Sequence, residues 1–194
     1  MTLEGIDRSG KSTQAVLLAR ALGDEAISVR EPGGTAAGER VRDILKDPGV
    51  PLGAEGEALL FAAARAQLVR EVIRPALDAR RTVVCDRFLD SSLAYQGAAR
   101  GLGIDTVRSI NQPGVGQLRP HVTILLEIDR EAATGRGAED DRFEREGDLL
   151  QRAVAEAYEA LAAAEPERWR RVDAARAPEE VHADVLAAVE AARA

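Results

Sequence analysis

The sequence of 194 residues predicts an α/β protein of three layers, a five-stranded parallel sheet with helices on both faces. The first observation behind this prediction is that short apolar runs alternate with longer segments of helical period along the whole chain. The second is that runs such as Thr82–Asp86 and Val122–Ile128 are almost continuously apolar, as in strands buried on both faces. We expect one domain over residues 1–194, because a chain of this length with 45% apolar residues can bury its own core.

The first half of the chain is predicted to contain three strands, each followed by helical sequence. Gly23 is a helix-stop signal, and the turn Glu31-Pro32-Gly33-Gly34 closes the second strand. Pro75 lies inside the longest helical segment and should kink or split it. The predicted elements are a strand at Thr2–Ile6, a helix at Ser12–Leu22, a strand at Ala26–Arg30, a helix at Ala37–Lys46, a loop at 47–53, a helix at Glu55–Ala79 and a strand at Thr82–Asp86.

The second half continues the alternation of strands and helices. Residues 135–146 are charged and carry two glycines, and Phe143 is their one large apolar residue. Such a composition suits a mobile lid with cations, although for this segment taken alone a solvated surface loop is the preferred interpretation. The other predicted elements are helices at Ser91–Gly101 and Asp105–Asn111, a loop at 113–116, a strand at Val122–Ile128, a helix at Leu149–Ala164, a strand at Arg170–Asp173 and a helix that begins at Pro178.

Composition excludes several classes of function. The net charge of −7 argues against a nonspecific nucleic-acid binder, which needs a basic surface. Cys85 is the only cysteine, so a disulfide framework or a cysteine metal cluster is excluded, and His121 and His182 are far apart in sequence. We find no apolar run of the length that a membrane helix needs and no signal peptide, and we therefore expect a cytoplasmic protein with no membrane partner.

A phosphate-binding loop nearly opens the chain. Residues 5–12 fit the pattern G-x-x-x-x-G-K-[ST] at every fixed position. The two glycines allow backbone N–H groups to turn inward toward an anion, and the following helix directs its positive end at the same phosphates. Lys11 supplies a charge for the β- and γ-phosphates of ATP, and Ser12 supplies a hydroxyl for Mg²⁺. Loop and topology together predict a fold of the P-loop NTPase type.

Four further clusters follow predicted strands or lie on the long helix, where open α/β sheets bind ligands. Phe61 and Arg65 are four residues apart and project from one helical face, so they could receive a nucleotide base, although for this pair taken alone a core Phe beside a solvated Arg is the preferred interpretation. Arg87 follows a buried strand and suits a second phosphate. The four clusters are Arg30-Glu31-Pro32-Gly33-Gly34-Thr35, the pair Phe61 and Arg65, residues 86–97, and residues 136–144.

Taken together, these motifs resemble the thymidylate kinase family, whose members phosphorylate dTMP with ATP on the path to dTTP. The resemblance rests on E-G-I-D-x-x-G-K-S-T-Q, R-E-P-G-G-T, F-x-x-x-R and D-R-F-x-x-S-S-x-A-Y-Q-G, which occur in this order over nearly the whole chain. It implies a homodimer, Mg²⁺ with ATP as co-substrate, a lid at about 135–146 and a cis peptide bond between Glu31 and Pro32. His121 and Glu127 replace acids that are usual in the family, the lid is short, and the first strand is expected to lack its front half.

The resemblance also implies a role for each matching residue. Asp7 should bind the sugar 3′-hydroxyl with Glu31 nearby, Phe61 should stack on thymine, and Arg42 and Arg87 should hold the dTMP phosphate. The ATP-binding set is Gly5, Ile6, Asp7, Arg8, Ser9, Gly10, Lys11, Ser12, Thr13, Arg136 and Arg142. The dTMP-binding set is Asp7, Glu31, Arg42, Phe61, Arg65, Arg87, Ser92 and Gln96, with Arg65, Ser92 and Gln96 at the polar edge of the base. Ser12 and, through water, Asp86 should hold Mg²⁺.

Catalysis is expected from positioned charge, because phosphoryl transfer requires little covalent chemistry of the protein. The predicted catalytic residues are Lys11, Arg8, Arg136 and Arg87. Arg8 lies inside the phosphate loop, whereas many bacterial members of the family rely on lid arginines such as Arg136, and this chain carries both. We favour Arg8 as the main charge on the transferring group, since the loop fixes it in advance.

Two alternatives differ from this interpretation in the reaction or in the class of protein. Another nucleotide or nucleoside kinase, for example one for dUMP, would share the loop, but a nucleoside kinase would not need Arg42 and Arg87 as a second phosphate clamp. A P-loop switch or regulatory ATPase would drive partners instead of phosphorylating a small molecule. The sequence contains no N-K-x-D motif for guanine and no additional domain to be driven.

Overall fold

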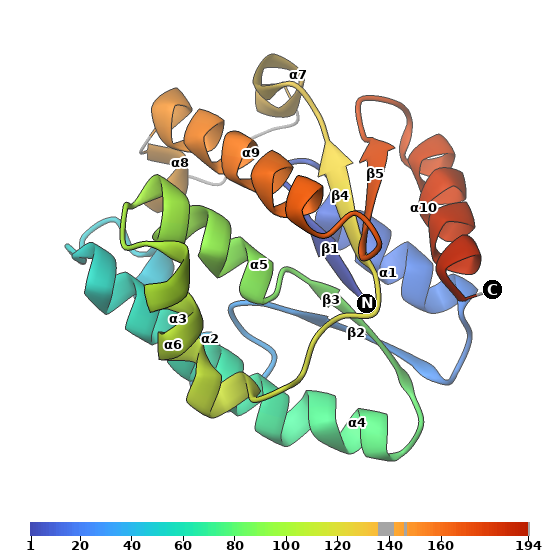
Figure 1. Ribbon diagram of the computed structural model, residues 1–194, viewed down its shortest axis with the longest axis horizontal. Helices are drawn as coiled ribbons and strands as arrows, with labels where there is room; N and C mark the ends of the chain where they lie inside the picture. The colour runs from blue at the N-terminus through green and yellow to red at the C-terminus, as the bar shows by residue number, and fades with distance from the viewer. Residues whose placement is uncertain (136–141, 146, 194) are drawn as a thin grey trace.

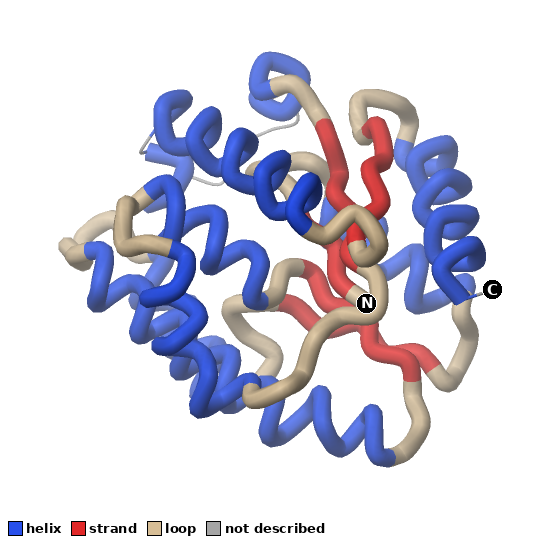
Figure 2. The backbone as a smooth tube through the Cα atoms, viewed as in Figure 1, coloured by secondary structure: helices blue, strands red, loops and turns tan. Residues whose placement is uncertain are grey.

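The computed structural model describes residues 1–135, 142–145 and 147–193 (Figure 1). Over these residues five strands form one parallel sheet in the order β2-β3-β1-β4-β5, which confirms the predicted fold class. Helices cover both faces of the sheet, as Figure 2 shows. The strands are β1 (Thr2–Glu4), β2 (Ala26–Arg30), β3 (Thr82–Asp86), β4 (Thr123–Glu127) and β5 (Trp169–Asp173).

The short strand β1 lies at the centre of the sheet. Its partners are β3, with Thr2 opposite Cys85, and β4, with Thr2 opposite Thr123. The backbone N–H of Arg87 donates to Leu3 O at 3.0 Å, which extends the β1–β3 ladder beyond β3. The strand order reverses at this point, so the loop that leaves β1 emerges in the crevice where such sheets bind ligands.

Alternating side chains on the strands divide the core between the two faces of the sheet. Val84 of β3 packs with Leu18 of helix α1 (Lys11–Ala21) and with Val185 of helix α10 (Pro178–Arg193). Its neighbours Val83 and Cys85 point to the opposite face, in a separate apolar cluster. Successive side chains of a strand point to opposite faces of the sheet. A strand that is apolar at every position is therefore expected to be buried on both faces.

The remaining helices connect the strands and form the walls of the crevice. Within the described residues no helix is both long and apolar enough to cross a membrane. The helical segments are α2 (Ala36–Lys46), α3 (Ala54–Leu68), the π-helical η1 (Val69–Ile73), α4 (Arg74–Asp78), α5 (Leu89–Ser92), the π-helical η2 (Leu93–Ala99), α6 (Ile104–Val115), α7 (Arg130–Thr134), α8 (Arg142–Arg145) and α9 (Gly147–Ala164).

Pro75 does not split the long helix that precedes β3. The segments α3, η1 and α4 follow one another without a break from Ala54 to Asp78. The π-helical turn Val69–Ile73 lies just ahead of Pro75 and widens the helix where the proline ring would crowd the carbonyl of Glu71. The chain thus accommodates Pro75 by a change of helical pitch.

The loop predicted at 113–116 is wrong, because α6 continues through Pro113 to Val115. The physical reason is a close contact between α6 and α3. A Cβ atom added at Gly114 would lie 2.5 Å from Cβ of Ala66, so the two helices approach each other as closely as a glycine allows. Packing against α3 outweighs the local preference of Pro and Gly for a loop.

Candidate functional site

The phosphate loop joins β1 to α1 in a conformation that depends on glycine. Gly5 has φ 141°, and a Cβ atom there would lie 2.6 Å from Leu126 O. Gly10, at the start of α1, has φ 96°. Arg8 has φ 64°, which is unusual for a residue with a side chain and marks a backbone held in place by its surroundings. Of the other predicted ATP-binding residues, Ile6 and Ser9 lie in the loop itself and Thr13 lies in the first turn of α1.

Lys11 is buried and folded back over the loop. Its Nζ donates to Ile6 O at 2.6 Å and to Ser9 Oγ at 3.2 Å. Burial, and then the nearby charge of Arg87, lower the pKa of Lys11 to about 8. A triphosphate in the loop would compensate this ammonium, so the loop and the lysine are complementary to a polyanion.

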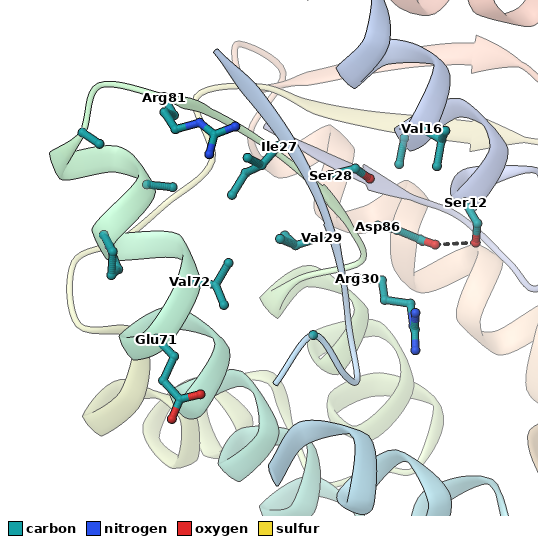
Figure 3. Close-up of a pocket in the computed structure, with 15 residues that line it drawn as sticks. Ser12, Val16, Ile27, Ser28, Val29, Arg30, Glu71, Val72, Arg81 and Asp86 are labelled. Atoms are coloured by element: carbon teal, nitrogen blue, oxygen red, sulfur yellow. Dashed lines mark hydrogen bonds between the residues drawn. The ribbon is translucent and has the colours of Figure 1, made fainter. Parts of the chain in front are cut away.

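Ser12 and Asp86 meet beside the loop, where the resemblance places Mg²⁺. The Ser12 hydroxyl donates to Asp86 Oδ2 at 2.5 Å (Figure 3). The other carboxylate oxygen, Asp86 Oδ1, is buried and has no hydrogen-bond partner among the residues that the structure describes. A hydroxyl beside a carboxylate with a spare buried oxygen is a donor set that suits Mg²⁺ and its water shell.

The cleft of Figure 3 is mostly apolar and reaches this pair only at one end. It has a volume of about 840 Å³ and lies along the edge strand β2, between α1 and the η1–α4 segment. Ile27 and Val29 of β2, Val16 of α1 and Val72 of η1 line it. Its polar lining residues are spread around an apolar surface, so we assign the chemistry to the loop and to the strand ends instead.

Arg87 connects the end of β3 to the phosphate loop. Its backbone has φ 67°, which turns the side chain toward Gly5. Nη1 donates to Gly5 O at 3.1 Å and to Ser91 Oγ at 3.1 Å. Nη2 donates to Asp7 Oδ1 at 2.5 Å, and the guanidinium lies 5.1 Å from the ring centroid of Tyr95. Arg87 is therefore held in place from several sides.

Asp7 contacts Arg87 and also a residue of α9 that was not predicted from the sequence. Gln151 of α9 donates from Nε2 to Asp7 Oδ2 at 2.7 Å, and its Oε1 accepts from the backbone N–H of Asp7 at 3.3 Å. Burial favours the protonated acid, but the charges of Arg87 and Lys11 outweigh it and lower the pKa of Asp7. No local signal marks Gln151, because it stands inside an ordinary amphipathic helix.

Glu31 and Arg65 form a buried ion pair behind the crevice. Arg65 is 1% exposed and donates from Nε to Glu31 Oε2 at 2.7 Å. Its other nitrogens donate to Asn111 Oδ1 at 2.6 Å and to Phe88 O at 3.1 Å. Burial raises the pKa of Glu31 to about 7 although Arg65 opposes the shift. The expected cis peptide bond between Glu31 and Pro32 is present.

The predicted base-binding residues lie on α3 and on η2. The ring of Phe61 lies 5.9 Å from that of Phe143, centroid to centroid. Gln96 donates from Nε2 to Glu57 Oε1 at 2.7 Å, a contact that the sequence did not indicate. Ser92 Oγ is buried with no hydrogen-bond partner in the described part of the chain. A buried polar atom without a partner is uncommon in a folded protein and is consistent with a polar ligand at that place.

The remaining predicted arginines lie in different surroundings. Arg42 of α2 donates to Pro32 O at 3.0 Å, next to the end of β2. Arg142 of α8 forms an ion pair with Glu57 at 2.7 Å and donates to Leu45 O at 3.0 Å, so it contacts α2 and α3. Its proposed contact with ATP stays a prediction. Arg136, and with it most of the predicted lid, lies outside the described residues.

A second cleft opens directly against the phosphate loop. It has a volume of about 560 Å³ and is lined by residues 8–14 of the loop and the first turn of α1, by Ala174 and Arg176 between β5 and α10, and by Pro178 at the start of α10. Gln14 Nε2 donates to Pro178 O at 2.8 Å and ties α1 to that connection. The β5–α10 connection was not predicted as part of the site from the sequence. It follows the last strand, and a position at the end of a strand is the kind of signal that marked other predicted clusters.

Comparisons with known proteins agree with this geometry. A family model described as thymidylate kinase matches residues 3–185. The thymidylate kinase of Pelotomaculum thermopropionicum is 48% identical over 98% of this chain and 92% of its own, and that of Deinococcus radiodurans is 46% identical over 97% and 95%. The crystal structure of a thymidylate kinase from Ehrlichia chaffeensis superposes with a TM-score of 0.82 at 28% identity, covering 97% of this chain and 96% of that one.

Proposed function

This chain belongs to the thymidylate kinase family and is a kinase that transfers the γ-phosphoryl group of ATP to dTMP to give dTDP, and on that premise we propose how its residues divide the work. The observation that carries the proposal is the hydrogen bond from Arg87 Nη1 to Gly5 O at 3.1 Å. This hydrogen bond joins Arg87, the cation expected to hold the phosphate of dTMP, to Gly5, the first residue of the loop expected to hold the phosphates of ATP. Two phosphate-binding elements in contact fit transfer between two phosphates.

On the donor side, the phosphates of ATP bind the loop and Lys11, and the adenosine lies in the cleft beside the β5–α10 connection. The support is continuity, because loop residues 8–14 line that cleft together with Ala174 and Arg176. Lys11 Nζ donates to Ile6 O and Ser9 Oγ, and the ammonium has a third hydrogen that a phosphate oxygen can accept.

Ser12 and Asp86 are the residues proposed to hold Mg²⁺, Asp86 through water. The spare buried oxygen Asp86 Oδ1 supports this assignment. When bound, the metal neutralises charge on the β- and γ-phosphates. Asp86 sits at the end of β3 and Ser12 at the start of α1, so the sheet and the helix fix both groups before any nucleotide binds.

On the acceptor side, Arg87 and Arg42 hold the dTMP phosphate and Asp7 binds the sugar 3′-hydroxyl near Glu31. Phe61 stacks on thymine, and Arg65, Ser92 and Gln96 face its polar edge. The unmatched Ser92 Oγ supports a polar ligand at that place. Arg65 already donates to Glu31, Asn111 and Phe88, so these partners fix the orientation of its guanidinium group.

Arg8 is the residue proposed to stabilise the charge on the transferring phosphoryl group, and Arg136 and Arg142 are proposed to close the site. Arg8 belongs to a loop whose backbone is already fixed at φ 64°, and a preorganised cation needs no rearrangement in the transition state. The acceptor phosphate is already anionic, so the proposed mechanism contains no general base.

We further propose a homodimer in the cytoplasm. The supporting observation for the dimer is that α2 and α3 each expose an apolar side chain, Ile44 at 41% and Leu59 at 57%. Sedimentation of Leu59→Glu should show a shift toward monomer, while Leu149→Glu on α9, where the native leucine is 82% exposed, should sediment as the unchanged protein does. A monomeric unchanged protein would contradict the dimer.

A coupled assay of ADP release across the common nucleoside monophosphates tests the substrate assignment. We expect dTMP to give the highest kcat/KM, dUMP to follow, and thymidine itself to give no turnover because it has no phosphate for Arg87. Release of ADP that needs no acceptor would instead favour a P-loop ATPase.

A further inference from the structure

A buried carboxylate of α3 contacts the amide that we place at the thymine edge. Glu57 is 1% exposed. Its Oε1 accepts from Gln96 Nε2 at 2.7 Å and from Arg100 Nε at 3.2 Å. Its Oε2 accepts from Arg100 Nη2 at 3.0 Å and lies 2.7 Å from Arg142 Nη2. Glu57 thus joins α3, η2 and α8 through one side chain.

These contacts determine which way the Gln96 amide points. A glutamine amide has two ends of similar shape, an NH₂ that donates and an oxygen that accepts. Both oxygens of Glu57 face guanidinium nitrogens, which can only donate, and they accept from Arg100 Nε and Nη2. The NH₂ of Gln96 must therefore face Glu57, and its Oε1 faces away from it.

The direction of Gln96 Oε1 matters because pyrimidines differ at N3. Thymine and uracil carry an N3–H that donates, whereas N3 of cytosine is an acceptor. An oxygen at this place accepts from the N3–H of thymine and would oppose the lone pair of cytosine N3. A site that leaves a buried acceptor without a donor rejects the wrong base strongly.

We propose that Glu57 is a positioning residue that sets specificity for thymine over cytosine by fixing the orientation of the Gln96 amide. The inference rests on the proposed function, in which Gln96 faces the base. Helical spacing supports it, because Glu57, Phe61 and Arg65 follow one another at intervals of four on α3. The same face therefore carries the orienting acid, the stacking ring and the buried arginine.

The direct test compares kcat/KM for dTMP and dCMP in the full-length chain. In Glu57→Gln the side chain at 57 can donate as well as accept, so the Gln96 amide is free to turn. We expect the dTMP to dCMP ratio to fall by about tenfold or more, mainly through the KM for dTMP, with the KM for ATP unchanged. An unchanged ratio in a folded Glu57→Gln enzyme would overturn the inference.

Arg100→Met is the matched control for a purely structural role. It removes two hydrogen bonds to Glu57 but leaves the bond between Glu57 and Gln96. We expect a lower melting temperature and an unchanged base ratio. If Arg100→Met lowers the ratio as much as Glu57→Gln does, Glu57 acts only through the packing of α3 on η2, and the inference fails.

An exchanged pair separates orientation from stability, even if Glu57→Gln alone does not fold. In the double variant Glu57→Gln with Gln96→Glu, the amide now at 57 donates to the carboxylate at 96, which again presents an oxygen to the base. We expect the double variant to recover most of the preference for dTMP that Gln96→Glu alone loses. No recovery would contradict the inference.

Gln96→Leu distinguishes failure of the inference from failure of the proposed function. If Gln96→Leu collapses the base ratio and Glu57→Gln does not, Gln96 reads the base without help from Glu57. If Gln96→Leu leaves the ratio unchanged, Gln96 does not read the base, and the proposed acceptor pocket is wrong at that position.

Discussion

Asp7 and Arg87 stand eighty residues apart in the sequence and meet at the centre of the site, with Arg87 Nη2 2.5 Å from Asp7 Oδ1. Asp7 comes from the loop after β1, and Arg87 from the residue after β3. The pairing of these neighbouring strands brings the two side chains together, and Gln151 holds the second oxygen of Asp7. The acceptor end of the site is therefore built before substrate binds.

Removal of the Arg87 side chain should weaken the binding and the alignment of dTMP. For Arg87→Ala we expect a higher KM for dTMP and a kcat lowered about tenfold or more, because the phosphate loses both a partner and its alignment. The KM for ATP should change little. Steady-state kinetics with each substrate varied measures this. Arg81→Ala, at the other end of β3, is the control and should behave like the unchanged enzyme. A shift confined to the KM for ATP would assign Arg87 to the donor.

Lys11→Ala should abolish turnover and spare the fold. Lys11 carries charge to the β- and γ-phosphates, so we expect kcat to fall by more than about tenfold, or 1.4 kcal/mol of barrier. Lys46→Ala changes the only other lysine of the chain and should retain activity. Circular dichroism melts of both variants show whether the fold is intact. A loss of activity smaller than tenfold would refute the assignment of the loop.

ATP binding should weaken as the pH rises above about 8. Burial, and then Arg87, lower the pKa of Lys11 to about 8 in the free protein, whereas bound phosphates favour the charged ammonium and raise it. Binding therefore takes up a proton above pH 8, and affinity falls by at most about tenfold per pH unit there. Calorimetry in two buffers of different ionisation enthalpy measures the proton. Binding without proton uptake at about pH 8.5 would contradict this value.

Phe61→Ala should weaken dTMP binding by about 1–3 kcal/mol, the scale of base stacking on an aromatic ring. In the structure Phe61 is itself only partly buried, and its ring lies 5.9 Å from that of Phe143, centroid to centroid. Calorimetric titration with dTMP gives the affinity, and a thermal melt gives the stability. If the melting temperature drops while the affinity holds, Phe61 belongs to the core and not to the base site.

Arg8→Gly should lower the single-turnover rate by at least about a hundredfold, the scale of losing one transition-state donor. Glycine adopts φ 64° without strain, so this variant removes the charge and keeps the loop conformation. Arg136→Ala should cost clearly less and act partly through the KM for ATP. If Arg136→Ala slows the chemical step more than Arg8→Gly does, the lid supplies the main catalytic charge.

The fold and the phosphate loop could be predicted because their signals are local. Runs such as Thr82–Asp86 carry the strand pattern within five residues, and the spacing of Gly5, Gly10 and Lys11 encodes the loop directly. The helical course of Pro113 could not be predicted, since it depends on Gly114 meeting Ala66 of another helix. The role of Gln151 could not be predicted either, because it depends on a contact with Asp7, which lies 144 residues away in the sequence.

The buried network around Arg65 has a consequence for anyone who would redesign the pocket for another base. Arg65 gives its nitrogens to Glu31, Asn111 and Phe88 O, and all three partners lie in the interior. A single substitution at position 65 would leave the carboxylate of Glu31 and the amide of Asn111 buried without this hydrogen-bond partner. The resulting loss of folding free energy can exceed any gain in binding from a better fit to the new base. Laboratory evolution by one substitution at a time should therefore stall here, and libraries that vary positions 31, 65 and 111 jointly should succeed where it fails.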